Sequence, residues 1–125
     1  MTRLRLVAAV AVLALVPAGA ALGGKHATST AKPKATLVAT VADPFVISLT
    51  KGGKKVATLK AGRYTIVVKD SAADHDFHLF GPGLDKTTSV TGTGTTTWKV
   101  TLKKGAYTYQ CDPHASFMKG SFTVK

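Results

Sequence analysis

Alternation of apolar and polar residues with a period of two is the feature that most limits what this chain can fold into. Successive side chains of a β-strand point to opposite faces, so this alternation predicts half-buried strands. No segment shows the 3.6-residue period of an amphipathic helix. From Thr36 onward the alternation recurs in six segments: Phe45/Ile47/Leu49, Tyr64/Ile66/Val68, Phe77/Leu79, Trp98/Val100/Leu102, Tyr107/Tyr109/Cys111 and Phe122/Val124.

Turn signals separate these segments. About seven to eight short strands at this spacing predict an all-β fold, a β-sandwich or a closed barrel. The stretch from Thr87 to Thr97, rich in Thr, Gly and Ser, is predicted to be a long loop or an edge hairpin. The turn signals are Asp43-Pro44, Gly52-Gly53, Ala61-Gly62, Gly81-Pro82-Gly83, Gly92-Thr93-Gly94, Lys104-Gly105 and Lys119-Gly120.

The first twenty residues carry the pattern of a secretory signal peptide. Arg3 and Arg5 precede an apolar run of eleven residues, Leu6 to Val16, which is too short to span a bilayer. A proline ends the run, and the small residues before and at Ala20 are typical of a cleavage site. No cysteine near this site offers a point for lipid attachment.

We therefore divide the chain into a signal peptide at residues 1–20, a flexible linker at 21–35 and a folded domain at 36–125. The linker is rich in Gly, Ala, Ser, Thr and Lys and has no hydrophobic period. Cleavage makes the protein secreted or extracytoplasmic, in the periplasm or at the cell surface. Retention of the N-terminal segment as a membrane anchor is the alternative, and it requires a longer apolar run.

The chain is strongly basic, with 17 Lys and Arg against 6 acidic residues, all of them Asp. Without Arg3 and Arg5 of the signal peptide, 15 basic residues face these 6, a net charge near +9. The lysines are scattered and not interleaved with aromatic residues, so no nucleic-acid binding is indicated. The basic surface favours partners with acidic surfaces and loose association with an anionic membrane or cell surface.

The only cysteine begins the segment Cys111-Asp112-Pro113-His114-Ala115-Ser116-Phe117-Met118. A thiolate, an imidazole and a thioether thus lie within eight residues, and further imidazoles lie upstream at His75 and His78. One Cys, two His and a weak axial Met are the ligand set of a blue-copper site, because sulfur and imidazole together accept both Cu(I) and Cu(II). We therefore expect one copper ion bound by Cys111, His114, Met118 and one upstream histidine.

Strand alternation selects between the two upstream histidines. His75 shares its parity with Phe77 and Leu79, whose apolar side chains point to the core. His78 and Asp76 have the opposite parity and are expected on the other face. His75 is therefore the predicted ligand, unless a bulge shifts the register.

Other chemistries fit these residues less well. A catalytic thiol would pair Cys111 with His114, but no Asn or Asp is evident to orient the histidine. Structural zinc would use the same thiolate and imidazoles, yet methionine as fourth ligand argues against zinc. A multicopper oxidase would carry His on both sides of the cysteine, where this chain has Gln110 and Asp112. A structural or adhesive β-sandwich with an incidental cysteine is a further alternative.

The residues around the predicted ligands resemble those of cupredoxins of the plastocyanin/azurin type. The resemblance covers about residues 36–125 and implies a Greek-key β-sandwich with one mononuclear copper at one end. By motif, it implies that the ligands are His75, Cys111, His114 and Met118, and that the edge of His114 faces solvent and conducts the electron. The matching stretches are Asp74-His75-Asp76-Phe77, Gly105-Ala106-Tyr107-Thr108-Tyr109-Gln110-Cys111-Asp112-Pro113-His114 and Met118-Lys119-Gly120.

Two positions depart from the pattern of that family. The family usually has Asn after the first ligand histidine, whereas this chain has Asp76, which keeps an acceptor and loses the amide donors. A negative charge there predicts a lower reduction potential than Asn would give. Plastocyanins also place an exposed aromatic residue before the cysteine, where partners dock. This chain has Gln110 instead, so the resemblance leaves its docking surface open.

Together these features predict a monomeric, secreted type 1 (blue) copper protein that carries single electrons between redox partner proteins. The chain by itself is not expected to be an enzyme. An extracytoplasmic protein that binds or delivers copper without an electron-transfer role would use the same ligands, and it is the alternative function.

Overall fold

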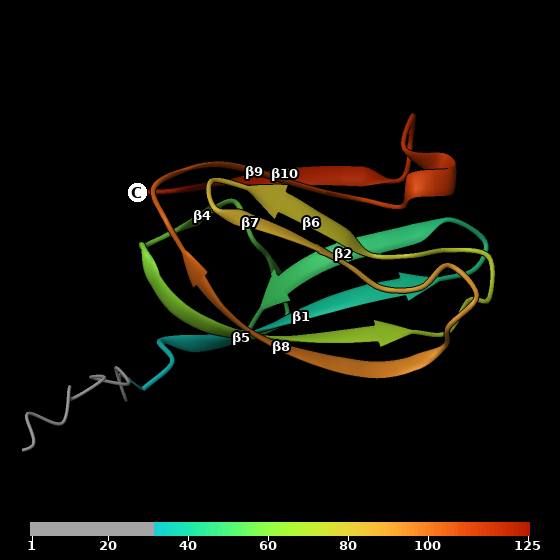
Figure 1. Cartoon of the computed structure of the whole chain (residues 1–125), viewed down its shortest axis with the longest axis horizontal. Helices are drawn as coiled ribbons and strands as arrows, with labels where there is room; N and C mark the ends of the chain where they lie inside the picture. The colour runs from blue at the N-terminus through green and yellow to red at the C-terminus, as the bar shows by residue number, and fades with distance from the viewer. Residues whose placement is uncertain (1–31) are drawn as a thin grey trace, which may run out of the picture.

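The computed structural model describes residues 32–125, so the predicted signal peptide and most of the predicted linker lie outside the described residues. The described chain forms two five-stranded sheets packed face to face, with one short 3-10 helix (Figure 1). No helix within residues 32–125 has the length and apolar character needed to cross a membrane. The prediction of an all-β sandwich is confirmed.

The first sheet has the strand order β3-β2-β1-β5-β8. Strands β1 and β5 are parallel, and the other neighbours are antiparallel. A parallel pair needs a crossover connection, and here the chain crosses through the second sheet before β5. The bounds are β1 (Ala35–Ala42), β2 (Val46–Lys51), β3 (Lys54–Lys55), β5 (Gly62–Asp70) and β8 (Gly94–Leu102).

The second sheet has the strand order β4-β10-β9-β6-β7, in which only β4 and β10 are parallel. Two of the ten strands have two residues each, so eight longer strands match the predicted number. Because β8 begins at Gly94, the loop expected at 87–97 is shorter than predicted. The bounds are β4 (Thr58–Leu59), β6 (His78–Gly81), β7 (Leu84–Thr87), β9 (Gly105–Gln110) and β10 (Lys119–Val124).

The core lies between the two sheets and is built from the residues that alternate inward. In β5, for example, Tyr64, Ile66 and Val68 are buried while their neighbours are more exposed. One residue of the predicted alternation lies outside the core: Phe45 is 54% exposed. Strand β2 begins at Val46, so Phe45 lies in the turn before it, where strand alternation does not apply.

The side chain of Tyr107 joins the turn between β6 and β7 to the connection between β8 and β9. Its hydroxyl accepts a hydrogen bond from the Lys103 amide (2.9 Å) and lies 3.0 Å from the Pro82 carbonyl oxygen. The ring lies against the backbone of Gly81, where an added Cβ would be 2.3 Å from the nearest ring atom. A glycine is therefore required at position 81 by close packing.

Gly81→Ala should lower the free energy of unfolding by about 1–3 kcal/mol, because the hydrogen-bonded ring of Tyr107 cannot move away without losing its partners. Urea denaturation of the metal-free protein measures the change. Ser121→Ala, at an exposed position of β10, is the control and should shift the midpoint little. Equal midpoints for the two variants would show that the sheet accommodates the added methyl group.

Candidate metal centre

Two loops at one end of the sandwich bring the predicted ligands together. Cys111 follows β9, and the chain then forms a 3-10 helix at Asp112–His114 before Met118 leads into β10. His75 lies in the connection between β5 and β6. Because β6 and β9 are neighbours, with His78 opposite Gln110, these two loops meet at the same edge (Figure 1).

Three donor atoms converge at this point. Sγ of Cys111 lies 3.6 Å from Nδ1 of His75 and 3.5 Å from Nδ1 of His114. The two Nδ1 atoms are 3.1 Å apart. Such a cluster of one thiol and two imidazoles, with all ligand atoms within 4.8 Å of one another, can hold a metal ion.

The cluster is shielded from solvent on most sides. Cys111 and His75 are fully buried, Met118 is 1% exposed, and His114 is half-buried. Burial raises the pKa of the Cys111 thiol, although backbone groups of Asp76 and His114 act in the opposite direction. A bound cation would favour the thiolate that burial disfavours, because a metal ligand must be deprotonated.

The orientation of His75 is set by the turn between β1 and β2. Its Nε2 lies 3.0 Å from the carbonyl oxygen of Pro44, which can only accept a hydrogen bond. Nε2 therefore carries the proton, and the lone pair of Nδ1 faces Cys111 and His114. A backbone partner on the second ring nitrogen is the usual means of fixing a ligand tautomer.

His75 is buried as its parity predicts, but it does not lie in a strand. Strand β6 begins at His78, so the histidine lies in a loop where strand parity does not apply. Asp76, expected on the opposite face, is also buried, with 2% of its surface exposed. His78 lies outside the cluster, because its two ring nitrogens contact Asp112 and Asp85.

The segment from Cys111 to Met118 is closed by its own backbone. The Cys111 amide donates to the Met118 carbonyl (2.9 Å), and the His114 amide donates to the Cys111 carbonyl (3.0 Å). The amides of Phe117 and Met118 both donate to the His114 carbonyl (3.1 and 2.9 Å). These bonds bring Met118 back beside Cys111, and the proline at the start of the 3-10 helix restricts the turn further.

Asp76 joins the two loops directly. Its Oδ1 accepts a hydrogen bond from the Asp112 amide (2.6 Å), and its Oδ2 accepts one from the Thr87 hydroxyl (3.2 Å). Both bonds need only acceptors, which explains how a carboxylate can stand where the resemblance leads us to expect an amide. The carboxylate also raises the pKa of the Cys111 thiol, after the larger effect of burial.

His78 holds the ligand loop from outside. Its Nδ1 lies 2.8 Å from Oδ1 of Asp112, and its Nε2 lies 2.8 Å from Oδ1 of Asp85. Burial lowers the pKa of His78, but the hydrogen bonds to the two carboxylates outweigh it, so the pKa is raised. The Gln110 side-chain amide also donates a hydrogen bond to Oδ1 of Asp112 (2.9 Å). At the position where plastocyanins have an exposed aromatic residue, this chain therefore has a side chain that binds the ligand loop.

Two exposed phenylalanines flank the half-buried His114. The rings of Phe45 and Phe117 are 54% and 59% exposed and meet edge to face, with centroids 5.1 Å apart. Their centroids lie 5.3 and 5.6 Å from that of His114. Sequence patterns do not reveal this apolar face, because Phe45 alternates with Ile47 and Leu49 as a core residue would, and Phe117 shows no pattern beyond its place in the ligand segment.

The fold and this donor set are those of a cupredoxin. The family model for copper-binding proteins of the plastocyanin/azurin family matches residues 32–125. The chain therefore belongs to the plastocyanin/azurin family of copper-binding proteins, and its cofactor is one copper ion. The buried thiol and imidazoles fit that ion, since soft sulfur and imidazole donors suit copper.

Two solved structures share the fold of this chain. A rusticyanin mutant is 21% identical, with a TM-score of 0.51, and the match covers 72% of this chain and 76% of the rusticyanin chain. Reduced auracyanin from the photosynthetic bacterium Roseiflexus castenholzii is 20% identical, with a TM-score of 0.52, and the match covers 75% and 99% of the two chains. No curated protein matches the sequence.

His78→Gln should reduce the stability of the metal-free protein by about 1 kcal/mol near pH 6, with a smaller effect near pH 8. The folded pKa of His78 is raised above its ordinary value of 6.5, so its stabilising effect is complete below that value. The effect is lost as the pH rises through the folded pKa. Urea denaturation at a series of pH values measures this, and parallel curves for the two proteins would contradict it.

Asp76→Asn should raise the reduction potential of the copper-loaded protein. A carboxylate beside the site stabilises Cu(II) relative to Cu(I), and the amide removes that charge while keeping one acceptor oxygen. Spectroscopic redox titration measures the potential. Thr87→Val is the control, since it removes the hydroxyl bond to Asp76 without changing the charge. An equal or lower potential in Asp76→Asn would contradict the charge argument.

Proposed function

We propose that this protein is a secreted type 1 copper protein that carries single electrons, with His75, Cys111, His114 and Met118 as the copper ligands. The observation that carries this proposal is the unequal burial of the four residues. Three are enclosed in the sandwich, and only His114 reaches the surface. Such a site retains its metal and offers one route for an electron.

The rigidity of the ligand loops supports electron transfer over copper delivery. Backbone hydrogen bonds close the segment from Cys111 to Met118, and Asp76 ties it to the loop of His75. A site held in one geometry reduces the rearrangement between Cu(I) and Cu(II). A delivery protein would instead need an opening through which an acceptor could take the metal, and the half-buried His114 alone provides little room.

We propose that redox partners dock on the apolar face formed by Phe45, Val46 and Phe117. Exposed apolar groups that lie together mark interaction sites, and these rings surround the one candidate ligand that reaches solvent. Asp43 and Asp74 lie beside this face, each with its side chain 70% exposed. Because this face itself carries acidic neighbours, it gives no support for an acidic partner. That expectation stays a prediction that rests on the net charge of the chain alone.

The proposal includes export, a monomeric state and the absence of enzymatic activity by the chain alone. Export is supported by the signal-peptide pattern of residues 1–20. A multicopper oxidase would have histidine on both sides of the cysteine, to connect this copper to further copper ions. Here Gln110 and Asp112 flank Cys111 and are hydrogen-bonded to each other, which argues against such a site.

Titration of the full chain with Cu(II) should produce an intense thiolate-to-copper absorption band and a type 1 EPR spectrum. The band should bleach on reduction and return on oxidation, and it should be absent in Cys111→Ala. Ser116→Ala, an exposed position in the same loop, is the control and should keep the band. Weak binding that does not depend on Cys111 would overturn the ligand assignment.

Phe117→Ala should slow electron self-exchange by about fivefold or more and leave the absorption band in place. Removing a central apolar side chain weakens the association of the two molecules that exchange the electron. NMR line broadening of mixtures of oxidised and reduced protein measures the rate. Thr101→Ala, at an exposed position of β8, is the control. If instead copper passes readily to a metal-free acceptor and self-exchange is negligible, the delivery function is favoured.

A further inference from the structure

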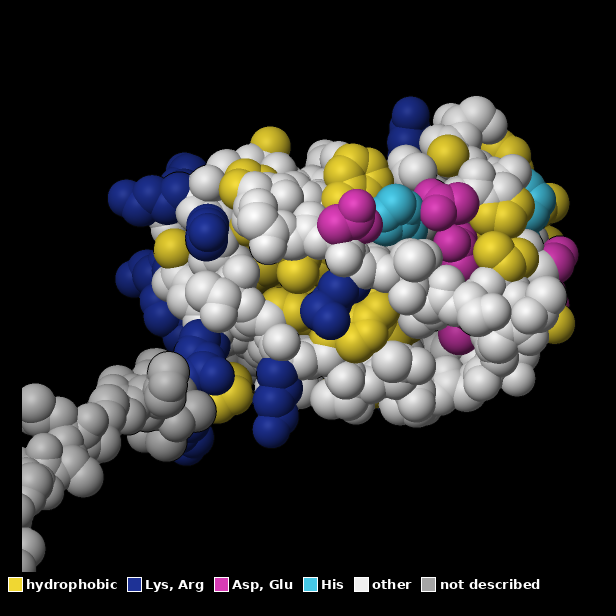
Figure 2. Space-filling model, viewed as in Figure 1, with side chains coloured by type: hydrophobic (Ala, Val, Ile, Leu, Met, Phe, Trp, Pro, Cys, Tyr) yellow, Lys and Arg dark blue, Asp and Glu magenta, His cyan; other side chains and the backbone are white. Residues whose placement is uncertain are grey.

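Charged side chains are segregated along the long axis of the domain. On the face drawn in Figure 2, most Lys and Arg side chains gather at the end where β1 begins, and Asp and His lie toward the opposite end. The contacts agree, because Asp43 and Asp74 lie beside His75, and Asp85 and Asp112 pair with His78. The lysines and the carboxylates thus concentrate at opposite ends, although Lys69 and Lys119 lie toward the copper end.

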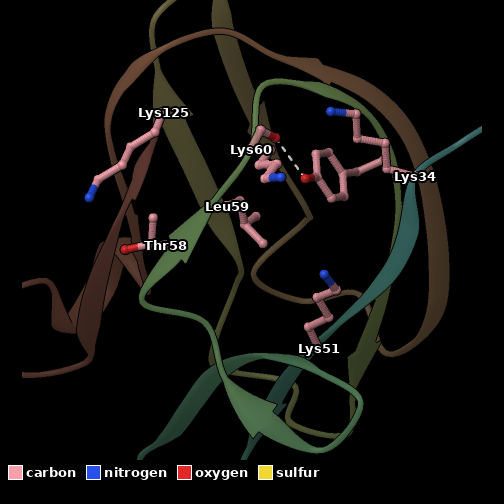
Figure 3. Close-up of a pocket in the computed structure, with 7 residues that line it drawn as sticks. Lys34, Lys51, Thr58, Leu59, Lys60 and Lys125 are labelled. Atoms are coloured by element: carbon pink, nitrogen blue, oxygen red, sulfur yellow. Dashed lines mark hydrogen bonds between the residues drawn. The ribbon is translucent and has the colours of Figure 1, made fainter.

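A groove at the basic end is surrounded by four lysines. Its volume is about 450 Å³, and no Asp or Glu is among its lining residues. Figure 3 shows that the lysines come from separate segments, with Lys34 before β1, Lys51 ending β2, Lys60 following β4 and Lys125 following β10. The topology thus gathers in one place positive charges that are scattered in the sequence. We call this set of four lysines the lysine rim.

The floor of the groove is apolar and firmly held. Leu59 and Tyr64 are 5% and 3% exposed, and the Tyr64 hydroxyl donates to the Lys60 carbonyl (2.7 Å), as drawn in Figure 3. Lys34 donates to the Ala61 carbonyl (2.6 Å), which fixes its side chain at the edge. Positive groups above a small apolar floor match the headgroup region of a bilayer, where lysine stems lie in apolar surroundings and their ammonium groups meet phosphates.

The position of the groove in the chain also points to a membrane. Lys34 lies at the start of the described residues, so the 31 residues that precede them lead to the lysine rim. Those residues include the apolar run at 6–16. Until the predicted cleavage after residue 20, the basic end is therefore the part of the domain that lies nearest along the chain to this apolar run.

We propose that the lysine rim docks the domain on anionic lipid headgroups, with the copper end turned away from the bilayer. Lysines near an anionic leaflet are attracted by its surface potential, and the attraction adds up over several side chains within a Debye length. In this orientation the face of Phe45 and Phe117 points away from the lipid. The docking rests on charge and shape at the basic end and does not depend on the electron-carrier function.

The test compares two charge-matched variants of the full chain. Lys51→Gln/Lys60→Gln/Lys125→Gln removes three positive charges from the lysine rim. The control variant removes three exposed lysines from β5, β7 and β8, namely Lys69→Gln/Lys86→Gln/Lys99→Gln. Binding is measured by co-sedimentation with vesicles of equal parts phosphatidylglycerol and phosphatidylcholine, and with pure phosphatidylcholine. Because both variants keep residues 1–31, any contribution of that segment is common to them.

The rim variant should bind the anionic vesicles about tenfold or more weakly than the unchanged chain, and the control variant should lose much less. Both should keep the urea midpoint and the copper absorption of the unchanged chain. Equal losses in the two variants would show attraction by net charge alone and overturn the proposal, as would no loss in the rim variant. Competition by millimolar inorganic phosphate at constant ionic strength would also overturn it, by showing a site for free phosphate.

Discussion

The pairing of β6 with β9 is the constraint on which the metal centre depends. It places His78 opposite Gln110, so the loop before β6 and the loop after β9 leave the same edge of the sheet. The hydrogen bond from the Asp112 amide to Asp76 continues this pairing beyond the last ladder residues. Residues 36 positions apart in sequence thus face one another. The first sheet contributes as well, because the Pro44 carbonyl that orients His75 lies in the turn between β1 and β2.

Local patterns in the sequence were sufficient for the fold class and for part of the site. The period-two alternation predicted the sandwich. The short spacing from Cys111 to Met118 predicted a loop that brings several donor atoms together, because a short segment can fold back only in a few ways. His75 was selected by a strand parity that does not apply to it, since it lies before β6. Its orientation depends on the Pro44 carbonyl, a contact between segments that no local pattern encodes.

The surface could be predicted least. Phe45 alternates with Ile47 in the sequence, but the turn before β2 exposes it beside Phe117, a residue far along the chain. Net charge could be counted from the composition, yet its division between two ends depends on which strands meet. The carboxylates gather where the loops of the metal centre meet, and the lysine rim gathers where β1 begins and β4 and β10 end.

The separation of His75 from Cys111 has a further consequence for a domain that contains a single cysteine. Many small domains rely on disulfides, which restrict the unfolded chain by closing a loop. A metal bound by residues 36 positions apart closes a loop of the same kind, but reversibly and under the control of metal supply. Resistance to proteases would then depend on whether the protein has acquired its metal, and metal-free molecules would be degraded first.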